Sequence, residues 1–372
     1  MGSDRVLVVG AGIGGLSAAK AMADRGIDTD VVERAGSWSE GTGIYLPGNA
    51  VRALRDLGVA DPVMAAGRVN RRRRFLDQRG RTFWEVDVEE FWRGVAPPVG
   101  VHRQHLHGAL LDAVGAKIRM GATVSALEQG GGPVAVTFSD GATASYGFVV
   151  GADGVHSTVR GLLFGRSETR PSSLTAAAWR FVTANDMGID CWTVWASPGA
   201  LLLAVPIDDN RSYHFASLLR DHPGRATDPS VLIGATDAFC EPARRIVAQA
   251  LERGDPIHHS PVEDVRQAPY GRGRVLLIGD AAHAMAPAMA QGAALAMEDA
   301  LVLADLLAAG PSWDKATKLF EQRRRPRIAW VQQHTDRQAK LANLPPLTRR
   351  ISGKLVGARL WQNSFAPLRD PY

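Results

Sequence analysis

RVLVVGAGIGGLSAAKAMADRGIDTDVVE, residues 5–33, is the stretch of this chain that decides the fold. The apolar run Arg5–Val9 is typical of a buried strand, and Thr29–Glu33 has the length and composition of a second strand. Between them, the alanine-rich segment Leu16–Arg25 predicts a helix that follows a glycine turn. A strand, a tight turn, a helix and a strand in this order predict a Rossmann-type α/β unit at the start of the chain.

The glycine turn has the spacing G-x-G-x-x-G, formed by Gly10, Gly12 and Gly15. The first glycine allows the tight turn, the second lets a diphosphate approach the backbone, and the third lets the helix pack closely on the strand. The diphosphate then lies at the positive end of the helix, which begins near Gly14. We therefore place Gly10, Gly12, Ile13, Gly14 and Gly15 in a dinucleotide site.

An acidic residue follows where a dinucleotide requires one. Glu33 ends the second strand, 18 residues after Gly15, and its carboxylate can hold both hydroxyls of a ribose. The same carboxylate would repel a 2′-phosphate, so the first nucleotide is expected to be FAD or NAD rather than NADP. A Rossmann-like turn that binds nothing is the alternative, but the place of the motif between strand and helix favours binding.

The composition is that of an ordinary globular protein with a small positive charge. The chain has 372 residues, which fits two closely joined domains, and its formal net charge is +5. We expect the arginine runs Arg71–Arg74 and Arg323–Arg325 to be solvated surface, because the excess charge is small and dispersed. Nucleic acid needs a contiguous basic face and is not an expected partner. An anionic nicotinamide cofactor fits the modest positive field better.

Several other classes of protein are disfavoured. No apolar stretch approaches the ~20 residues of a membrane span, and no signal peptide fits before the first strand. Cys191 and Cys240 form neither a disulfide framework nor a Cys-x-x-Cys site, so we expect a cytoplasmic protein with no membrane partner. His102, His105 and His107 have no acidic or cysteine partner nearby in the sequence, and we expect no metal site.

The rest of the chain predicts further α/β structure with a different middle region. Helices are expected at Asn49–Leu57, Arg103–Val114 and Gln291–Ala308, and from Trp313 to about Leu341, with a break at Pro345 and Pro346. Strands are expected at Val134–Phe138, Ala142–Tyr146, Phe148–Ala152 and Val275–Gly279, with an antiparallel excursion over Arg71–Val88. Residues 174–219 carry Trp and Tyr in β-type runs, which suggests a sheet with one face available for a flat ligand.

Two further motifs lie far along the chain from the glycine turn. Residues 149–160 read VVGADGVHSTVR, and residues 277–300 read LIGDAAHAMAPAMAQGAALAMEDA. Together with the glycine turn they resemble the three signatures of the single-component, group A FAD-dependent monooxygenases, the family of aromatic hydroxylases with a para-hydroxybenzoate hydroxylase-like fold. The resemblance covers residues 5 to about 330, and three motifs in the right order make it specific.

The resemblance implies the architecture of the whole chain. We expect an α/β protein with a Rossmann-type FAD-binding domain, an inserted mixed β-sheet substrate domain and C-terminal helices. The FAD-binding domain is expected to be discontinuous, over residues 1–70, 100–172 and 266–330. The substrate domain then takes 71–99 and 173–265, and a helical segment takes 331–372.

The resemblance also implies which residues bind FAD. Glu33, with Arg34 beside it, corresponds to the group that holds the adenosine ribose, Arg103 to the arginine that reaches the diphosphate and ribityl chain, and Val124 to a backbone contact with adenine. Taken alone, Arg103 could equally be a surface arginine.

Further assignments concern the flavin end of the cofactor. Asp153 and Gly154 correspond to a motif associated with FAD and the passing nicotinamide, and Asp280 to the acceptor of a ribityl hydroxyl. Gly43 and Ile44 resemble the segment along the isoalloxazine ring. The loop at 287–294 would direct backbone N–H groups at flavin N1 and O2. Its binding residues are Pro287, Gln291, Gly292, Ala293 and Ala294.

One residue of this loop departs from the family pattern Pro-x-x-Gly-x-Gly. Ala290 stands where many relatives have the first glycine. If this residue adopts a positive φ, alanine costs about 1–2 kcal/mol there. The alternative is a slightly different path of the loop beside the flavin.

The family's chemistry implies NADH or NADPH as a transient reductant and O₂ as the oxidant. Oxygen would reach a small, electron-rich aromatic or polycyclic substrate through a flavin C4a-hydroperoxide. Tyr213 resembles the tyrosine that lines the pocket in several relatives, and His214 is expected to point the other way. Arg180 is a second catalytic candidate that could pair with an anionic substrate, although a position at the surface edge of the sheet is favoured.

The expected pocket is apolar and suited to a planar ligand. Trp179, Trp192, Trp195 and the segment Leu201–Val205 carry this prediction. Leu201 stands about where urate-type relatives have an arginine, which argues weakly against urate. The alternative function is an FAD-binding non-oxygenase: a reductase, an isomerase or a redox-sensing flavoprotein. The sequence allows a monomer or a homodimer.

Overall fold

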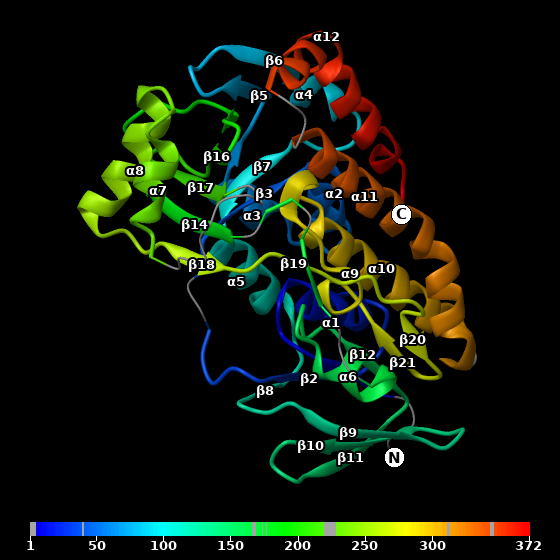
Figure 1. Cartoon of the computed structure of the whole chain (residues 1–372). Coiled ribbons are helices and arrows are strands. Elements are labelled where there is room, and N and C mark those ends of the chain that lie inside the picture. The colour runs from blue at the N-terminus through cyan, green and yellow to red at the C-terminus, as the bar shows by residue number, and fades with distance from the viewer. Residues whose placement is uncertain are drawn as a thin grey trace.

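The computed structural model describes residues 5–38, 41–165, 169–172, 174–175, 177–218, 228–310, 313–342 and 346–372, and for 177, 342 and 346–354 it describes the backbone only. Leu219 and Pro345, which bounded two of the expected segments, lie outside these residues. The chain forms two units that lie side by side, with a long C-terminal helical segment along them (Figure 1). No helix of the described part is long and apolar enough to cross a membrane.

A six-stranded sheet forms the centre of the first unit. Its order is β20 (Gly271–Arg272), β21 (Val275–Leu277), β12 (Phe148–Gly151), β1 (Val6–Val9), β2 (Thr29–Glu33) and β8 (Ile118–Met120). All neighbours are parallel except β20 and β21. The continuous apolar run of β1 is explained by burial on both faces, as parallel sheets require. The expected Rossmann-type α/β unit is confirmed.

Helices cover this sheet and join it to the rest of the chain. α1 (Ile13–Ala23) packs against the long α10 (Gly292–Ala309) and against α5 (Arg103–Ala113). The other helices of this unit are α2 (Gly48–Asp56), α3 (Ala60–Ala66), α6 (Thr158–Phe164) and α9 (Asp280–His283). The helices expected at 49–57, 103–114 and 291–308 therefore form, with ends that differ by at most one residue.

A seven-stranded mixed sheet forms the second unit. Its order is β18 (His258–Ser260), β14 (Ala177–Ala184), β17 (Arg211–Leu218), β16 (Ala200–Pro206), β15 (Trp192–Ala196), β5 (Arg72–Asp77) and β6 (Thr82–Asp87). Only β15 and β5 are parallel. The antiparallel pair expected over 71–88 is confirmed as β5 and β6, and it completes a sheet whose other strands come from after residue 176. The residue limits of the domains remain a prediction.

The two faces of this sheet have different neighbours. One face packs on α7 (Val231–Thr236) and α8 (Glu241–Arg253), which lie at the outer left of Figure 1, and forms a separate hydrophobic core. The other face is turned toward the first unit and forms a third apolar cluster. This second face is the one that is available to a ligand.

Three smaller sheets complete the β structure. A meander of β9 (Val124–Gln129), β10 (Val134–Phe138) and β11 (Thr143–Tyr146) confirms the expected hairpin. The second sheet consists of β3 (Gly43–Leu46), β7 (Val99–His102) and β4 (Arg68–Val69). The third sheet consists of β13 (Arg170–Pro171) and β19 (Glu263–Asp264).

The C-terminal segment lies over both units. α11 (Ala316–Ala342) contains Pro326 and follows the short turn η2 (Trp313–Lys315); α12 (Pro346–Phe365) and η3 (Ala366–Arg369) follow it. In Figure 1, α12 lies beside β6 and α4 (Val88–Phe91) at the top of the molecule. The contact is close, because a Cβ on Gly357 would lie 2.2 Å from the Trp84 ring. α11 and α12 thus cover one end of the space between the units.

Candidate active site

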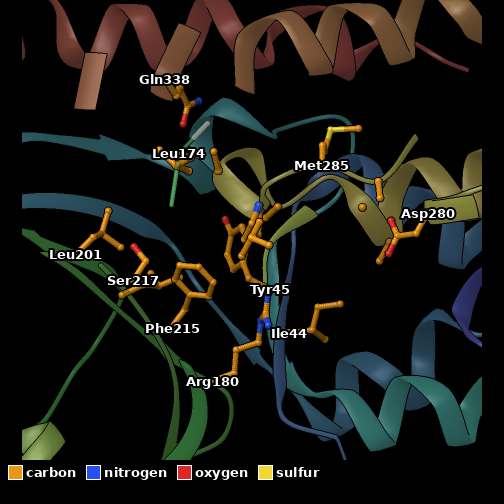
Figure 2. Close-up of a pocket in the computed structure, with 18 of the residues that line it drawn as sticks. Ile44, Tyr45, Leu174, Arg180, Leu201, Phe215, Ser217, Asp280, Met285 and Gln338 are labelled. Carbon is orange, nitrogen blue, oxygen red and sulfur yellow. The ribbon is translucent and has the colours of Figure 1, made fainter. Parts of the chain in front are cut away.

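A cavity of about 840 Å³ lies between the two units. The glycine turn, β3 and the 287–294 loop line one side, and the inner face of the seven-stranded sheet, here called the sheet wall, lines the other. Figure 2 shows Leu201, Phe215 and Ser217 on the sheet wall, Asp280 and Met285 on the opposite side, and Gln338 of α11 at the top. The cavity is large enough for a drug-sized ligand and mostly apolar.

The glycine turn has the geometry that a dinucleotide needs. Gly10 has φ of +102°, and a Cβ on Gly15 would lie 1.8 Å from the Gly10 carbonyl oxygen, so neither position tolerates a side chain. Gly12, Ile13 and Gly14 line the cavity at the start of α1, where no side chain caps the helix and no acidic residue lies in the first turn. Free N–H groups at a helix N-terminus fit a diphosphate, so the residues present fit FAD.

The ribose-binding candidate is held beside this turn. Glu33 accepts hydrogen bonds from the backbone N–H groups of Ala11 and Ala35, each at 2.8 Å. Arg34 is exposed at the end of β2. Val124 is buried in β9, outside the cavity lining, so any contact with adenine falls to its backbone.

The flavin-side segment lies in close contact with the sheet wall at Gly43. Gly43 and Ile44 line the cavity, and a Cβ on Gly43 would lie 2.2 Å from the Cβ of Tyr213. Only glycine fits there, because the backbone of Gly43 packs directly against the Tyr213 side chain. Arg103 lies exposed at the first turn of α5, also lines the cavity, and packs its stem over Gly41.

The Asp153-Gly154 motif has a structural task as well as a place at the cavity. The Asp153 carboxylate accepts from the Ser157 hydroxyl at 2.6 Å and from the Thr158 N–H at 2.7 Å, at the start of α6. Burial raises the pKa of Asp153 despite these hydrogen bonds. Gly154 lines the cavity. Arg160 is buried and donates to the Ala281 carbonyl at 2.7 Å, which ties this motif to the segment after Asp280.

Asp280 and the 287–294 loop lie on the same side of the cavity. Asp280 is exposed to it at the start of α9, and Pro287, Gly292 and Ala293 line it. Ala294 is fully buried behind them. The Gln291 side chain points away, since its amide nitrogen donates to Asn49 at 3.1 Å and its oxygen accepts from Asn49 at 2.9 Å.

Ala290 has φ of +51° and ψ of +37°, the left-handed conformation. It is the one residue other than glycine with a positive φ in the described ranges. The 287–294 loop therefore has a left-handed turn at Ala290, the conformation in which the expected strain of alanine arises. Alanine costs about 1–2 kcal/mol in this region, so the surroundings must hold it there.

A buried set of charges, here called the carboxylate–arginine cluster, lies behind this loop. It consists of Glu298, Asp299, Arg324 and Arg327. Arg324 donates to Asp299 at 2.7 Å and to Glu298 at 2.9 Å. Burial alone would raise the pKa of Asp299, but His283 and Arg324 outweigh it and hold the pKa below its usual range.

The cluster connects the cofactor side to the C-terminus. Asp299 accepts from the Gly279 N–H at 3.0 Å, next to Asp280, and Glu298 accepts from Asn49 at 3.0 Å. Arg327 donates to carbonyls of the last turn, including Leu368 at 3.0 Å. The cluster thus fixes the residues around Asp280 and the 287–294 loop.

The catalytic candidates Tyr213 and Arg180 both reach the cavity. Arg180 faces Tyr213 and donates to the Ser260 hydroxyl, with its guanidinium 5.3 Å from the Phe215 ring centroid. Burial raises the pKa of Tyr213, and the charge of Arg180 and a hydrogen bond from it offset part of the rise. The favoured expectation of a surface position for Arg180 is wrong, because β18 pairs outside β14 and encloses it.

The expected apolar ligand face is present, with one part of it misassigned. Trp192, Leu201 and Leu203 line the cavity. Trp179 and Trp195 point to the opposite face and pack with α8. His214 also points that way, as strand alternation predicts, and stacks on Phe181 at 4.9 Å.

Two groups of lining residues were missed in the sequence. The first is Arg73 of the sheet wall and Tyr45 of β3, both of which are buried. The expectation that both arginine runs are solvated surface is wrong for Arg73 and for Arg324, which are 5% and 0% exposed. The second group comes from the C-terminal helices and includes His334, Arg337, Gln338 and Trp361. Alternation along a strand could have separated Arg73 from Arg72 and Arg74.

The chain is similar to known proteins over nearly its whole length. The family described as "FAD binding domain" matches residues 4–338. A 3-amino-4-hydroxybenzoate 2-monooxygenase of Streptomyces cremeus is 33% identical over 92% of this chain and 88% of its own. A putative FAD-dependent monooxygenase of Bacillus subtilis, YetM, is 29% identical over 99% of both chains.

The fold is shared with solved structures as well. The Klebsiella pneumoniae protein HpxO, crystallised with FAD and uric acid, superposes with a TM-score of 0.87. It is 26% identical, over 98% of this chain and 96% of that one. The match includes both the dinucleotide unit and the inserted sheet, because it extends over almost all of both chains.

Proposed function

Because the chain belongs to the FAD-dependent, group A flavoprotein monooxygenases, we propose that it hydroxylates or epoxidises a small aromatic or polycyclic compound with NADH or NADPH and O₂ as co-substrates. Bound FAD would supply the redox chemistry: two electrons come from the nicotinamide, one atom of O₂ goes to the substrate and the other leaves as water, with a flavin C4a-hydroperoxide as the proposed oxygen donor. The observation that carries the proposal is the cavity, which has cofactor-binding segments on one side and an apolar sheet wall on the other.

The cofactor side of the cavity is assigned to the residues that fit FAD. The start of α1 would hold the diphosphate and Glu33 the ribose. Asp280 and the 287–294 loop would contact the ribityl chain and the ring, where N–H groups stabilise negative charge. Gly43 and Ile44 would lie along the ring, on the side of Tyr213.

The sheet wall is assigned to the substrate. Trp192, Leu203 and Phe215 offer flat apolar surface. Tyr213 and Arg180 would bind a phenolic oxygen of the substrate, and the guanidinium would stabilise the phenolate, which makes the ring a better nucleophile. α11 and α12 would exclude water from the reaction. Leu201 offers no charge to a urate, so urate is not the substrate that we propose.

The test is oxidation of NADH and NADPH by the FAD-loaded protein, with peroxide measured in parallel, against phenols, hydroxyquinolines and polycyclic aromatics. We expect one compound to accelerate flavin reduction and to gain one oxygen atom with little peroxide. A protein whose flavin neither nicotinamide reduces, with or without these compounds, would instead be the non-oxygenase or redox-sensing flavoprotein.

A further inference from the structure

Arg73 is a buried cation in the sheet wall. Its side chain is 5% exposed, and its guanidinium lies 3.6 Å from the ring centroid of Trp192. The ring centroid of Trp361, in α12, lies 5.6 Å from the same guanidinium. Its neighbours Arg72 and Arg74 point to the other face, where both pair with Glu85. The strand therefore turns one arginine of the run inward.

No carboxylate accompanies Arg73 in the described part of the chain. None of the ion pairs found there includes it, and its Nε has no hydrogen-bond partner. Burial lowers the pKa of Arg73 to about 10, which leaves it charged at neutral pH. A buried charge without a counter-ion is costly, and ring stacking offsets only part of that cost. The side chain lines the cavity, so a ligand can supply the missing charge.

Tyr45 adds a second donor at the same place. Its side chain is 6% exposed and lines the cavity, and its ring lies edge-on to Trp192 at 6.5 Å. The hydroxyl has no partner among the described residues. Burial raises the pKa of Tyr45, an effect that the charge of Arg73 only partly offsets, so the hydroxyl is a neutral donor. One cation of the sheet wall and one neutral O–H of β3 thus lie beside Trp192 without acceptors among the described residues.

We propose that Arg73 and the Tyr45 hydroxyl form an anion-binding subsite, and that the substrate is an aromatic acid whose carboxylate binds there. This inference rests on the proposed function, because it concerns the substrate of the same cavity. A carboxylate is planar, carries one negative charge and accepts from both donors, while the attached ring packs on Trp192. Arg180 is less suited to this task, since its guanidinium already bonds Ser260.

The position of the subsite bears on the size of the substrate. Arg180 lies on β14 and Arg73 on β5, and three strands separate them. Strands lie about 4.8 Å apart, so the two backbones are roughly 19 Å apart. A ligand that reaches both ends is longer than one ring, and we therefore include acids of one and two rings in the test.

The test measures binding to the oxidised, FAD-loaded protein without NAD(P)H, by titration calorimetry. The probes are matched acids and amides: 3-hydroxybenzoate, 4-hydroxybenzoate and 3-hydroxy-2-naphthoate, each against its carboxamide. The variants are Arg73→Met and Arg73→Lys, with Arg74→Met as the control on the same strand. FAD content and thermal unfolding are recorded for each protein before titration.

We expect the wild type and Arg74→Met to bind at least one acid about tenfold or more tightly than its amide, as a charge-assisted hydrogen bond allows. Arg73→Met should bind both equally, and Arg73→Lys should keep part of the preference. Equal affinity for acids and amides in the wild type, absence of binding by both included, would overturn the proposal. So would a preference that persists in Arg73→Met, or an Arg73→Met protein whose only defect is loss of FAD.

This experiment separates the subsite from the proposed function. Acid-selective binding that depends on Arg73, in a protein that never oxidises NAD(P)H, would leave the subsite standing and refute the monooxygenase. Oxygenation of a neutral aromatic compound, with no preference for acids in binding, would support the monooxygenase and refute the subsite.

Discussion

Arg324 and Arg73 are both almost completely buried, yet their surroundings differ in kind. Arg324, in the carboxylate–arginine cluster, donates to Asp299 at 2.7 Å and to Glu298 at 2.9 Å. Arg73 has aromatic rings around it and no carboxylate in the described part of the chain. Burial of a guanidinium is unfavourable at both places, so the comparison isolates what compensates for it.

This difference indicates that Arg324 is a structural cation and that Arg73 is a cation for ligand binding. The charge of Arg324 is balanced within the protein by Asp299 and Glu298, which in turn bond Gly279 and Asn49. Arg327 of the same cluster bonds the C-terminal turn. The charge of Arg73 is balanced by nothing in the described protein and faces a cavity. Loss of Arg324 should therefore damage the fold, and loss of Arg73 should damage recognition.

The largest effect is expected for Arg324→Met. It removes the cation that Glu298 and Asp299 share and leaves them buried with only Arg327 and His283 as ion-pair partners among the described residues, which costs about 3–5 kcal/mol of unfolding free energy. Urea unfolding of the FAD-loaded protein measures it. The control is Arg323→Met, because Arg323 is exposed and, among the described residues, its one hydrogen bond goes to the Tyr372 oxygen at 2.9 Å. A loss below 1 kcal/mol for Arg324→Met would mean that the cluster is not what stabilises this region.

Arg73→Met is expected to change stability in the opposite direction. Removal of an uncompensated charge should leave the unfolding free energy unchanged or raise it by up to about 2 kcal/mol, the stacking on Trp192 being lost at the same time. The same urea experiment, with no aromatic acid present, gives the value. A loss of more than 2 kcal/mol would show that Arg73 is structural, like Arg324, and the comparison would fail.

His214 sharpens the comparison, since burial without a charged partner neutralises a histidine but not an arginine. Burial lowers the pKa of His214 to about 3, whereas an unfolded histidine titrates near 6.5. Below pH 6.5 the unfolded chain binds a proton that the folded protein does not, so stability falls as the pH falls. Between pH 6.5 and 5.5 the loss is about 1 kcal/mol.

The variant His214→Phe measures this contribution, because phenylalanine keeps the stacking on Phe181 and removes the titration. Unfolding at both pH values should show wild-type stability falling about 1 kcal/mol further than that of the variant. An equal decrease in the two proteins would mean that His214 is protonated in the folded state or that its site is open to water.

The smallest effect is expected for Ala290→Gly, in the loop that the carboxylate–arginine cluster supports. Relief of about 1–2 kcal/mol of left-handed strain is reduced by the extra freedom of glycine in the unfolded chain, about 0.4–1 kcal/mol. A net gain of roughly 0.5–1 kcal/mol should raise Tm. Ala288→Gly is the control, because Ala288 has no positive φ and should lose stability. A lower Tm for Ala290→Gly would mean that the methyl group packs usefully.

The sequence predicts local features well and distant ones poorly. The glycine turn, the Asp153-Gly154 motif and Asp280 lie where short segments dictate their conformation, and the left-handed turn at Ala290 was anticipated as one of two outcomes. Arg180 was misplaced because its burial depends on β18, which is far away in sequence. Trp179 and Trp195 were misplaced because the face of a strand, not its composition, decides which side chain meets a ligand.

Arg73 shows the same limit most clearly. A run of four arginines indicates solvent, and only the inward face of β5 contradicts it. The groups that make its site, Trp192 and Trp361, come from β15 and α12. No short segment carries that information, since it arises only when strands from distant parts of the chain pair.

The discontinuity of both sheets also sets the order in which this protein can assemble. β12 pairs with β21, which ends at Leu277. β5 pairs with β15, which follows it by more than 100 residues. Contacts of such long sequence separation form slowly. On the ribosome, β1 and β5 can pair early with β2 and β6, but β12 lacks β21 until about three quarters of the chain has been synthesised. The seven-stranded sheet receives its last strand at Ser260 and the six-stranded sheet at Leu277, so the binding cavity closes late.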